Sequence, residues 1–154
     1  MEPVLYRRLS VGKTCLACLI GWLLLNPLGY GPEGKMLAGV AVVVGHALPV
    51  FYGFHGGKGV LSVAGIALCM NWWSTALALS LFFAVWALTS YMSLASMLAV
   101  TCWCTLAIIL FWGRWFVVVG AAALAVTVIV LHRANIGRLI HGTERKTYLR
   151  TPKE

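Results

Sequence analysis

The chain is a succession of apolar runs broken by short polar or glycine-rich stretches. The runs cover residues 14–28, 36–54, 60–70, 74–90, 91–112 and 116–131. A membrane-spanning helix needs roughly 20 consecutive apolar residues, or fewer where long side chains at its ends reach the interface. The pattern predicts an all-α, polytopic integral membrane bundle of about six spans, one or two of them short. We expect a single membrane domain over residues 1–154, ending in a basic tail at 132–154.

Turn signals separate these runs. Asn71-Trp72-Trp73 indicates a reversal at the membrane interface, where aromatic side chains gather, and Gly113-Arg114-Trp115 indicates a tight turn. The stretch 26–35 is rich in glycine and proline, so it is expected to be a loop. The next span should then begin at residue 36.

Composition agrees with a membrane location. Hydrophobic residues make up 61% and charged residues 10% of the 154 residues, and the mean hydropathy is +0.90. The acidic side chains are four glutamates, all outside the apolar runs. Sites that need paired carboxylates or carboxylate-bound Mg²⁺ are therefore disfavoured, and neither a metal nor a cofactor is expected. The five cysteines lie in apolar runs and are interpreted as packing residues.

The distribution of positive charge predicts the orientation of the bundle. Of the 12 Lys and Arg residues, all but Lys35 and Arg114 fall at the end that the two termini share. The positive-inside rule then places both termini in the cytoplasm. The net charge of +8 is explained by contact with anionic membrane lipids, so nucleic acid is not expected as a partner.

The stretch 45–60 is the strongest candidate for a binding site. Glycines let the backbone turn its N–H groups toward a ligand, and a lysine adds a positive charge, which together suit a phosphate group. The residues concerned are His46, His55, Gly56, Gly57, Lys58 and Gly59. The structural alternative is an ordinary loop with a positive-inside lysine, in which His46 bonds to a backbone carbonyl freed by Pro49.

Two further polar clusters are expected at the same face. Residues 89–96 place four Ser and Thr hydroxyl groups, with that of Ser93 among them, at a membrane boundary, where capping and helix contacts are the ordinary explanation. The tail begins with His132 and Asn135, which share one face of a helix expected to continue to about Lys146. This pair can hydrogen-bond a polar ligand, whereas a lipid-touching amphipathic tail is the alternative.

Taken in order, these motifs resemble those of the bacterial acyl-phosphate:glycerol-3-phosphate acyltransferases of the PlsY type. They are Gly-His-x-x-Pro-Val-Phe-x-x-Phe-x-Gly-Gly-Lys-Gly-Val, Ser-Leu-Ala-Ser and His-Arg-x-Asn-Ile-x-Arg-Leu-x-x-Gly-x-Glu, and the resemblance covers about residues 12–146. It implies a multi-pass enzyme of the bacterial inner membrane with its active face in the cytoplasm. Such an enzyme moves a fatty acyl group from acyl phosphate to glycerol 3-phosphate, giving lysophosphatidic acid for phospholipid biosynthesis.

The resemblance also implies roles for individual residues. By position in the motifs, Gly56, Gly57, Lys58 and Gly59 would hold phosphate, and Ser93, His132 and Asn135 would line the substrate site. An acyl phosphate is already activated, so the enzyme needs little beyond orientation of its substrates and stabilisation of charge. The scarcity of carboxylates is then no objection to catalysis.

Departures from the family pattern leave a second hypothesis open. The chain carries neither the family's N-terminal helix nor its first motif, Ser-Gly-Asn-x-Gly-Ala-Thr-Asn-x-x-Arg, and His55 stands where a basic residue usually precedes the glycine pair. The alternative is a catalytically silent member that binds acyl phosphate, anionic lipid or a protein partner. A transporter is disfavoured because no apolar run carries a charged residue in its middle.

Overall fold

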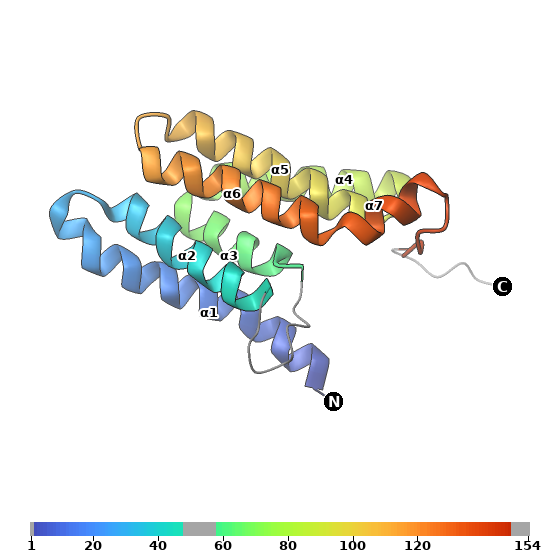
Figure 1. Ribbon diagram of the computed structural model, residues 1–154, viewed down its shortest axis with the longest axis horizontal. Coiled ribbons are helices and arrows are strands. Elements are labelled where there is room, and N and C mark those ends of the chain that lie inside the picture. The colour runs from blue at the N-terminus through green and yellow to red at the C-terminus, as the bar shows by residue number, and fades with distance from the viewer. Residues whose placement is uncertain (1, 48–57, 149–154) are drawn as a thin grey trace.

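The computed structural model describes residues 2–47 and 58–148, with side chains described from Ser10 onward, and every regular element in these ranges is a helix. In chain order they are α1 (Glu2–Leu25), the short 3-10 helix η1 (Asn26–Leu28), α2 (Gly31–Ala47), α3 (Val60–Met70), α4 (Trp72–Thr89), α5 (Met92–Leu110), α6 (Trp115–Leu131) and α7 (Arg133–Ile140). Helices α1 to α6 run back and forth along one long axis, and α1 begins toward the same end at which α7 lies (Figure 1). The predicted all-α membrane fold is confirmed.

The lengths of the helices agree with a membrane protein. Among the described residues, three helices can cross a membrane by length and composition, namely Ser10–Leu28, Trp72–Thr89 and Met92–Leu110. The pair α6 and α7 would make a fourth with a 56° bend, and α3 is apolar but shorter. Six crossings and cytoplasmic termini therefore stay predictions.

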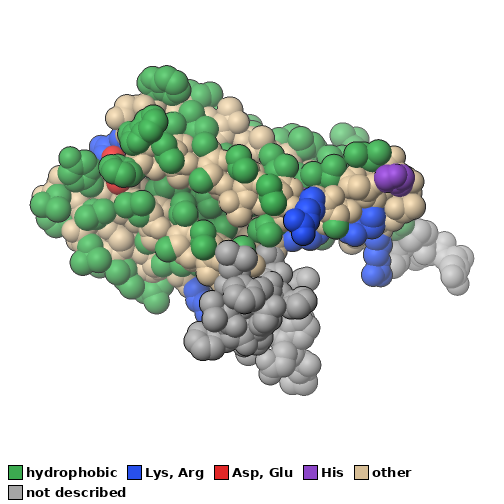
Figure 2. Space-filling model, in the orientation of Figure 1, with side chains coloured by type: hydrophobic (Ala, Val, Ile, Leu, Met, Phe, Trp, Pro, Cys, Tyr) green, Lys and Arg blue, Asp and Glu red, His purple; other side chains and the backbone are tan. Residues whose placement is uncertain are grey.

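The outer surface of the bundle suits contact with lipid. Large apolar side chains point outward, and Leu88 is 85% exposed. Figure 2 shows hydrophobic side chains along the whole length of one face, while the two largest Lys and Arg surfaces in view lie toward the end that holds α7. Trp72, Trp73, Trp112 and Trp115 are exposed at the opposite end, as expected of an aromatic belt at a membrane interface.

The core lies between helices that are distant in sequence. Met36 of α2, Ile66 of α3, Trp103 of α5 and Leu124 of α6 are fully buried in one apolar cluster. Helix α1 packs on α2 and α3. A Cβ at Gly21 or at Gly34 would collide with the backbone of the other glycine, so α1 and α2 touch backbone to backbone at this point.

Two helix starts differ from the prediction. Helix α2 begins at Gly31 rather than at residue 36, because Pro32 and Glu33 are well suited to a first helical turn, where N–H groups lack partners and the dipole favours a carboxylate. Helix α1 begins at Glu2 rather than at residue 14, so the polar segment before the first apolar run is also helical. The reversal at Asn71 is confirmed, with Asn71 Oδ1 accepting from Ser74 N at 3.1 Å.

The predicted helix up to about Lys146 is wrong, because α7 ends at Ile140. Gly142 adopts a left-handed conformation with φ +67°. The N–H of Thr143 donates to Arg138 O at 2.8 Å and that of Gly142 to Leu139 O at 3.2 Å, the bonding pattern of a Schellman motif. The chain therefore turns back beside α7 instead of continuing away from it.

The reversed segment is then held against α4 and α5. Thr147 N donates to Ser90 O at 2.8 Å, and Trp86 Nε1 donates to Thr147 O at 2.7 Å. Between the turn at Gly142 and this attachment lies Glu144. The two fixed points place its side chain over the start of α5.

Candidate active site

Glu144 is the centre of a polar cluster at the α7 end of the bundle. Its Oε1 accepts hydrogen bonds from Ser93 Oγ at 2.7 Å and from Asn135 Nδ2 at 2.6 Å. Its Oε2 accepts from Arg138 Nε at 2.7 Å. The Glu144 side chain is only 7% exposed. One carboxylate thus joins the first turn of α5, helix α7 and the tail.

The hydrogen bonds to Glu144 determine what the other groups can still do. Burial tends to raise the pKa of Glu144, but hydrogen bonds from Ser93, Asn135 and Arg138 and the charge of Arg138 outweigh it and lower this pKa to about 2. An ionised carboxylate only accepts, so Ser93 and Asn135 must act as donors toward it. Ser93 Oγ and Asn135 Oδ1 keep acceptor capacity for a ligand.

His132 occupies the bend between α6 and α7. It is 1% exposed, and its Nδ1 lies 2.8 Å from Val128 O. A carbonyl oxygen only accepts, so Nδ1 carries the proton and Nε2 of the neutral ring is an acceptor. The charges of Lys58 and Glu144 both act on this ring, which places His132 with the cluster.

Lys58 supplies positive charge to the same region. It is exposed and directly precedes Gly59, the N-cap of α3. Desolvation lowers the pKa of Lys58, while the charge of Glu144 opposes this shift and that of Arg138 adds to it. Lys58 therefore lies within electrostatic range of the cluster.

The predicted site residues fall into three groups. Lys58, Ser93, His132 and Asn135 are brought together, although they come from distant parts of the sequence. His55, Gly56 and Gly57 lie outside the described residues. Gly59 has φ +74° at the start of α3, and His46 lies on α2 beside a separate cavity. The functional roles of all these residues stay predictions.

Sequence reasoning missed Glu144 and Arg138 as members of the site. The expected helix to Lys146 would have carried Glu144 away from Asn135, so only the turn at Gly142 brings them together. The signal that could have found them is the glycine two residues before the glutamate, since glycine commonly ends a helix in a left-handed conformation.

A small cavity lies between α1, α2 and the first turn of α3. Its volume is about 200 Å³. It is lined by Ser10, Lys13, Val42, Gly45, His46 and Ser62. Among the described residues, no group of three or more His, Cys, Asp or Glu side chains is placed to hold a metal ion.

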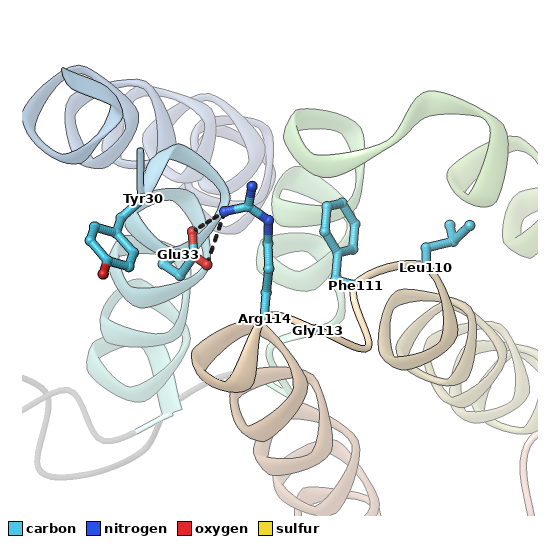
Figure 3. Close-up of a pocket in the computed structure, with 6 residues that line it drawn as sticks. All are labelled: Tyr30, Glu33, Leu110, Phe111, Gly113 and Arg114. Carbon is cyan, nitrogen blue, oxygen red and sulfur yellow. Dashed lines mark hydrogen bonds and ion pairs between the residues drawn. The ribbon is translucent and has the colours of Figure 1, made fainter. Parts of the chain in front are cut away.

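A larger cavity, of about 490 Å³, lies at the opposite end of the bundle and contains an ion pair (Figure 3). Arg114, at the start of α6, reaches across to Glu33 of α2, and its Nη1 lies 2.9 Å from Oε2 and 3.1 Å from Oε1. The same nitrogen donates to Gly29 O at 3.3 Å. Tyr30 and Phe111 flank the pair (Figure 3). We interpret this end as structural.

Comparisons with known proteins agree with one another. The family described as glycerol-3-phosphate acyltransferase matches residues 4–142. A glycerol-3-phosphate acyltransferase of Thermoanaerobacter sp. (strain X514) is 38% identical over 138 residues, covering 90% of this chain and 67% of the relative. One from Listeria monocytogenes (strain EGD-e) is 40% identical over 111 residues, covering 72% of this chain and 55% of the relative.

Solved structures show the same likeness in three dimensions. The crystal structure of PlsY (YgiH), an integral membrane glycerol 3-phosphate acyltransferase, matches in its lysophosphatidic acid form with a TM-score of 0.72 and 28% identity, covering 86% of this chain and 69% of that one. Its glycerol 3-phosphate form matches with a TM-score of 0.73, covering 87% and 68%. The family match spans most of the chain, and the fold agrees with it. The chain therefore belongs to the glycerol-3-phosphate acyltransferase family, a family of membrane enzymes.

Proposed function

We propose that this protein transfers a fatty acyl group from acyl phosphate to glycerol 3-phosphate, giving lysophosphatidic acid and inorganic phosphate. The observation that carries the proposal is the cluster organised by Glu144, which bonds to Ser93 and Asn135 and lies within electrostatic range of Lys58 and His132. Membership of the family supports it, as do the names of the ligand forms in which the similar structure was solved.

The chemistry requires only what this cluster can supply. The substrate hydroxyl attacks the acyl carbonyl carbon, a C–O bond forms, the bond between the acyl carbon and the phosphate oxygen breaks, and the hydroxyl proton ends on the released phosphate. Lys58 is suited to stabilise phosphate oxygens, because an ammonium group donates up to three hydrogen bonds. His132 Nε2 and Ser93 Oγ are suited to accept from the attacking hydroxyl and to orient it.

The active face is proposed to be cytoplasmic and the membrane to be the bacterial inner membrane. Lys58, Arg138 and Lys146 lie at the end where α7 is found, whereas Lys35 and Arg114 lie near the other end. The positive-inside rule supports a cytoplasmic location for the more basic end. Membrane lipids then surround the bundle, and the lipid product is released at its side.

The test uses the purified full chain in detergent with acyl phosphate and glycerol 3-phosphate, and it measures lysophosphatidic acid by mass spectrometry. We expect product from the wild type and a loss of at least about 100-fold in Lys58→Ala, since removing a preorganised charge contact costs rates on that scale. Arg145→Ala is the matched control, because Arg145 is exposed and makes no polar contact with the described residues. Folded wild-type protein that binds both phosphates without forming product would instead support the catalytically silent alternative.

A further inference from the structure

We propose that the larger cavity, at the end of the bundle opposite the Glu144 cluster, binds the headgroup of a phospholipid that carries both a phosphate and a primary ammonium group. In this arrangement Arg114 binds the phosphate and Glu33 binds the ammonium group. The lipid is then a structural component of this end of the protein. The inference goes beyond the proposed acyl transfer and does not rest on it, because the two residues belong to a separate cavity.

The ion pair leaves part of the Arg114 side chain unused. Its Nη1 makes every hydrogen bond of the guanidinium group to the described residues, namely those to both oxygens of Glu33 and to Gly29 O. Figure 3 shows Nε and Nη2 pointing away from Glu33. These two nitrogens form the edge of a guanidinium that binds a phosphate through two parallel hydrogen bonds. Arg114 therefore presents a phosphate-binding edge while it stays paired.

Glu33 also has capacity for a second partner. A carboxylate offers about four acceptor positions, and within residues 2–47 and 58–148 its side chain bonds to Nη1 of Arg114 alone. Its carboxylate lines the cavity (Figure 3). A primary ammonium group donates up to three hydrogen bonds. Glu33 can therefore bind an ammonium group without releasing Arg114.

The charge of the cavity indicates what kind of headgroup fits. One cation and one anion line it, and the other lining residues are uncharged: Tyr30, Leu110, Phe111 and Gly113. A ligand with a phosphate alone would be repelled by the carboxylate of Glu33, and a ligand with an ammonium group alone would be repelled by Arg114. A headgroup that carries both charges matches both residues.

The membrane itself can supply this ligand. Tyr30, Trp112 and Trp115 are exposed at this end of the bundle. Tyrosine and tryptophan gather at the level of lipid headgroups, so the cavity lies at the depth of the lipid phosphates. Leu110 is an exposed apolar residue of the lining, and it can contact the start of an acyl chain.

The size of the cavity agrees with a headgroup. Its volume of about 490 Å³ equals that of about sixteen water molecules at roughly 30 Å³ each. That leaves room for a phosphate, a two-carbon amine and the glycerol oxygens of the lipid. The acyl chains would lie outside, against the apolar surface of the bundle.

The experiment adds single lipids to the purified full chain in detergent. The probes are phosphatidylethanolamine, phosphatidylcholine and phosphatidylglycerol with the same acyl chains. Bound lipid is measured by native mass spectrometry, and stabilisation by the midpoint of thermal unfolding. We expect phosphatidylethanolamine to bind about tenfold more tightly than the other two, since the ammonium of phosphatidylcholine has no N–H and phosphatidylglycerol has no ammonium.

Two variants assign the two contacts. Arg114→Gln should weaken the affinity for phosphatidylethanolamine about tenfold or more, whereas the control Arg145→Gln should not change it. Glu33→Gln keeps an acceptor for Arg114 but removes the negative charge. Its preference for phosphatidylethanolamine over phosphatidylglycerol should therefore disappear or reverse, a result that a purely structural role of the ion pair would not produce.

The proposal is overturned if the wild type binds the three lipids equally, or if it prefers phosphatidylglycerol, which would indicate a site for an anionic lipid instead. It is also overturned if both variants keep the lipid preference of the wild type. Should Arg114→Gln fail to fold, the lipid preference of Glu33→Gln decides the question alone.

Discussion

The two ends of the bundle each carry a glutamate–arginine ion pair, and as pairs the two are nearly the same. At one end Glu33 is 7% and Arg114 is 42% exposed, and at the other Glu144 is 7% and Arg138 is 48% exposed. They differ in their remaining neighbours. Arg114 also bonds to the backbone at Gly29, whereas Glu144 also accepts from the side chains of Ser93 and Asn135.

This difference shows what an ion pair does in each place. The pair of Glu33 and Arg114 ties the start of α2 to the start of α6. The carboxylate of Glu144 accepts one hydrogen bond from each of two side chains and leaves their oxygen acceptors for a substrate. The first pair should therefore affect stability, and the second should affect activity.

Between the two ion pairs, the largest effect is expected from Glu144→Ala. Without the shared acceptor, Ser93 and Asn135 lose their orientation, and kcat/KM for acyl transfer should fall about 100-fold, the cost of misplacing groups by about 1 Å. Glu144→Gln keeps an acceptor oxygen and should lose less. Activity is measured per folded protein, with Glu33→Ala as the matched control. Equal losses of activity in the two alanine variants would contradict the comparison.

Glu33→Ala should act mainly on stability. It leaves Arg114 without its carboxylate at a site that is partly open, so we expect a loss of about 1–3 kcal/mol, between the values for surface and buried pairs. The midpoint of thermal unfolding in detergent measures this. Acyl transfer by the folded fraction should stay within about threefold of the wild type, because the pair touches no residue of the site. A large fall in activity with an unchanged midpoint would show that this end has a function.

Two glycines allow a smaller test of the same contrast. Gly142 has φ +67° and Gly29 has φ +82°, and a Cβ at either would meet no atom within 4 Å. Alanine at each should therefore cost about 1–2 kcal/mol through backbone conformation alone. Gly142→Ala should also lower kcat/KM several-fold, since this turn places Glu144, whereas Gly29→Ala should not. Equal activity in the two variants would show that the turn at Gly142 is not needed to position Glu144 for activity.

Much of the fold could be predicted from hydrophobic runs. Helices α3 to α6 begin and end within two residues of the predicted runs, because apolar stretches bounded by Asn71, Ser90 and Gly113 leave little choice. The starts of α1 and α2 were wrong, since hydrophobicity reports where a helix meets lipid and not where its hydrogen bonds begin. A helix can begin in a polar segment, and such a segment gives no hydrophobic signal in the sequence.

The site could be predicted only in part. Lys58, Ser93, His132 and Asn135 were chosen from motifs, and they do gather at one end. Glu144 was not chosen, because its contact with Asn135 depends on a single left-handed residue that reverses the chain. The cavity between α1, α2 and α3 was not predicted either, because it arises from packing between helices, which a linear pattern does not contain.

The smallest effect on activity is expected from pH, because at neutral pH the charge of Glu144 should not change. The pKa of Glu144 falls from 4.5 to about 2 on folding, so its ionised form stabilises the folded protein fully above about pH 4.5 and progressively less as the pH falls toward 2.

The Glu144→Gln variant tests this, because its side-chain amide does not titrate in this pH range. The difference in unfolding midpoint between wild type and Glu144→Gln, measured in detergent from pH 7 to pH 2.5, should be constant down to about pH 4.5 and then shrink. Arg145→Met should run parallel to the wild type throughout. The unfolding midpoint of Glu144→Gln could instead run parallel to that of the wild type at every pH. The hydrogen bonds to Glu144 would then not favour its ionised form, and the contrast between the two ends would have no electrostatic basis.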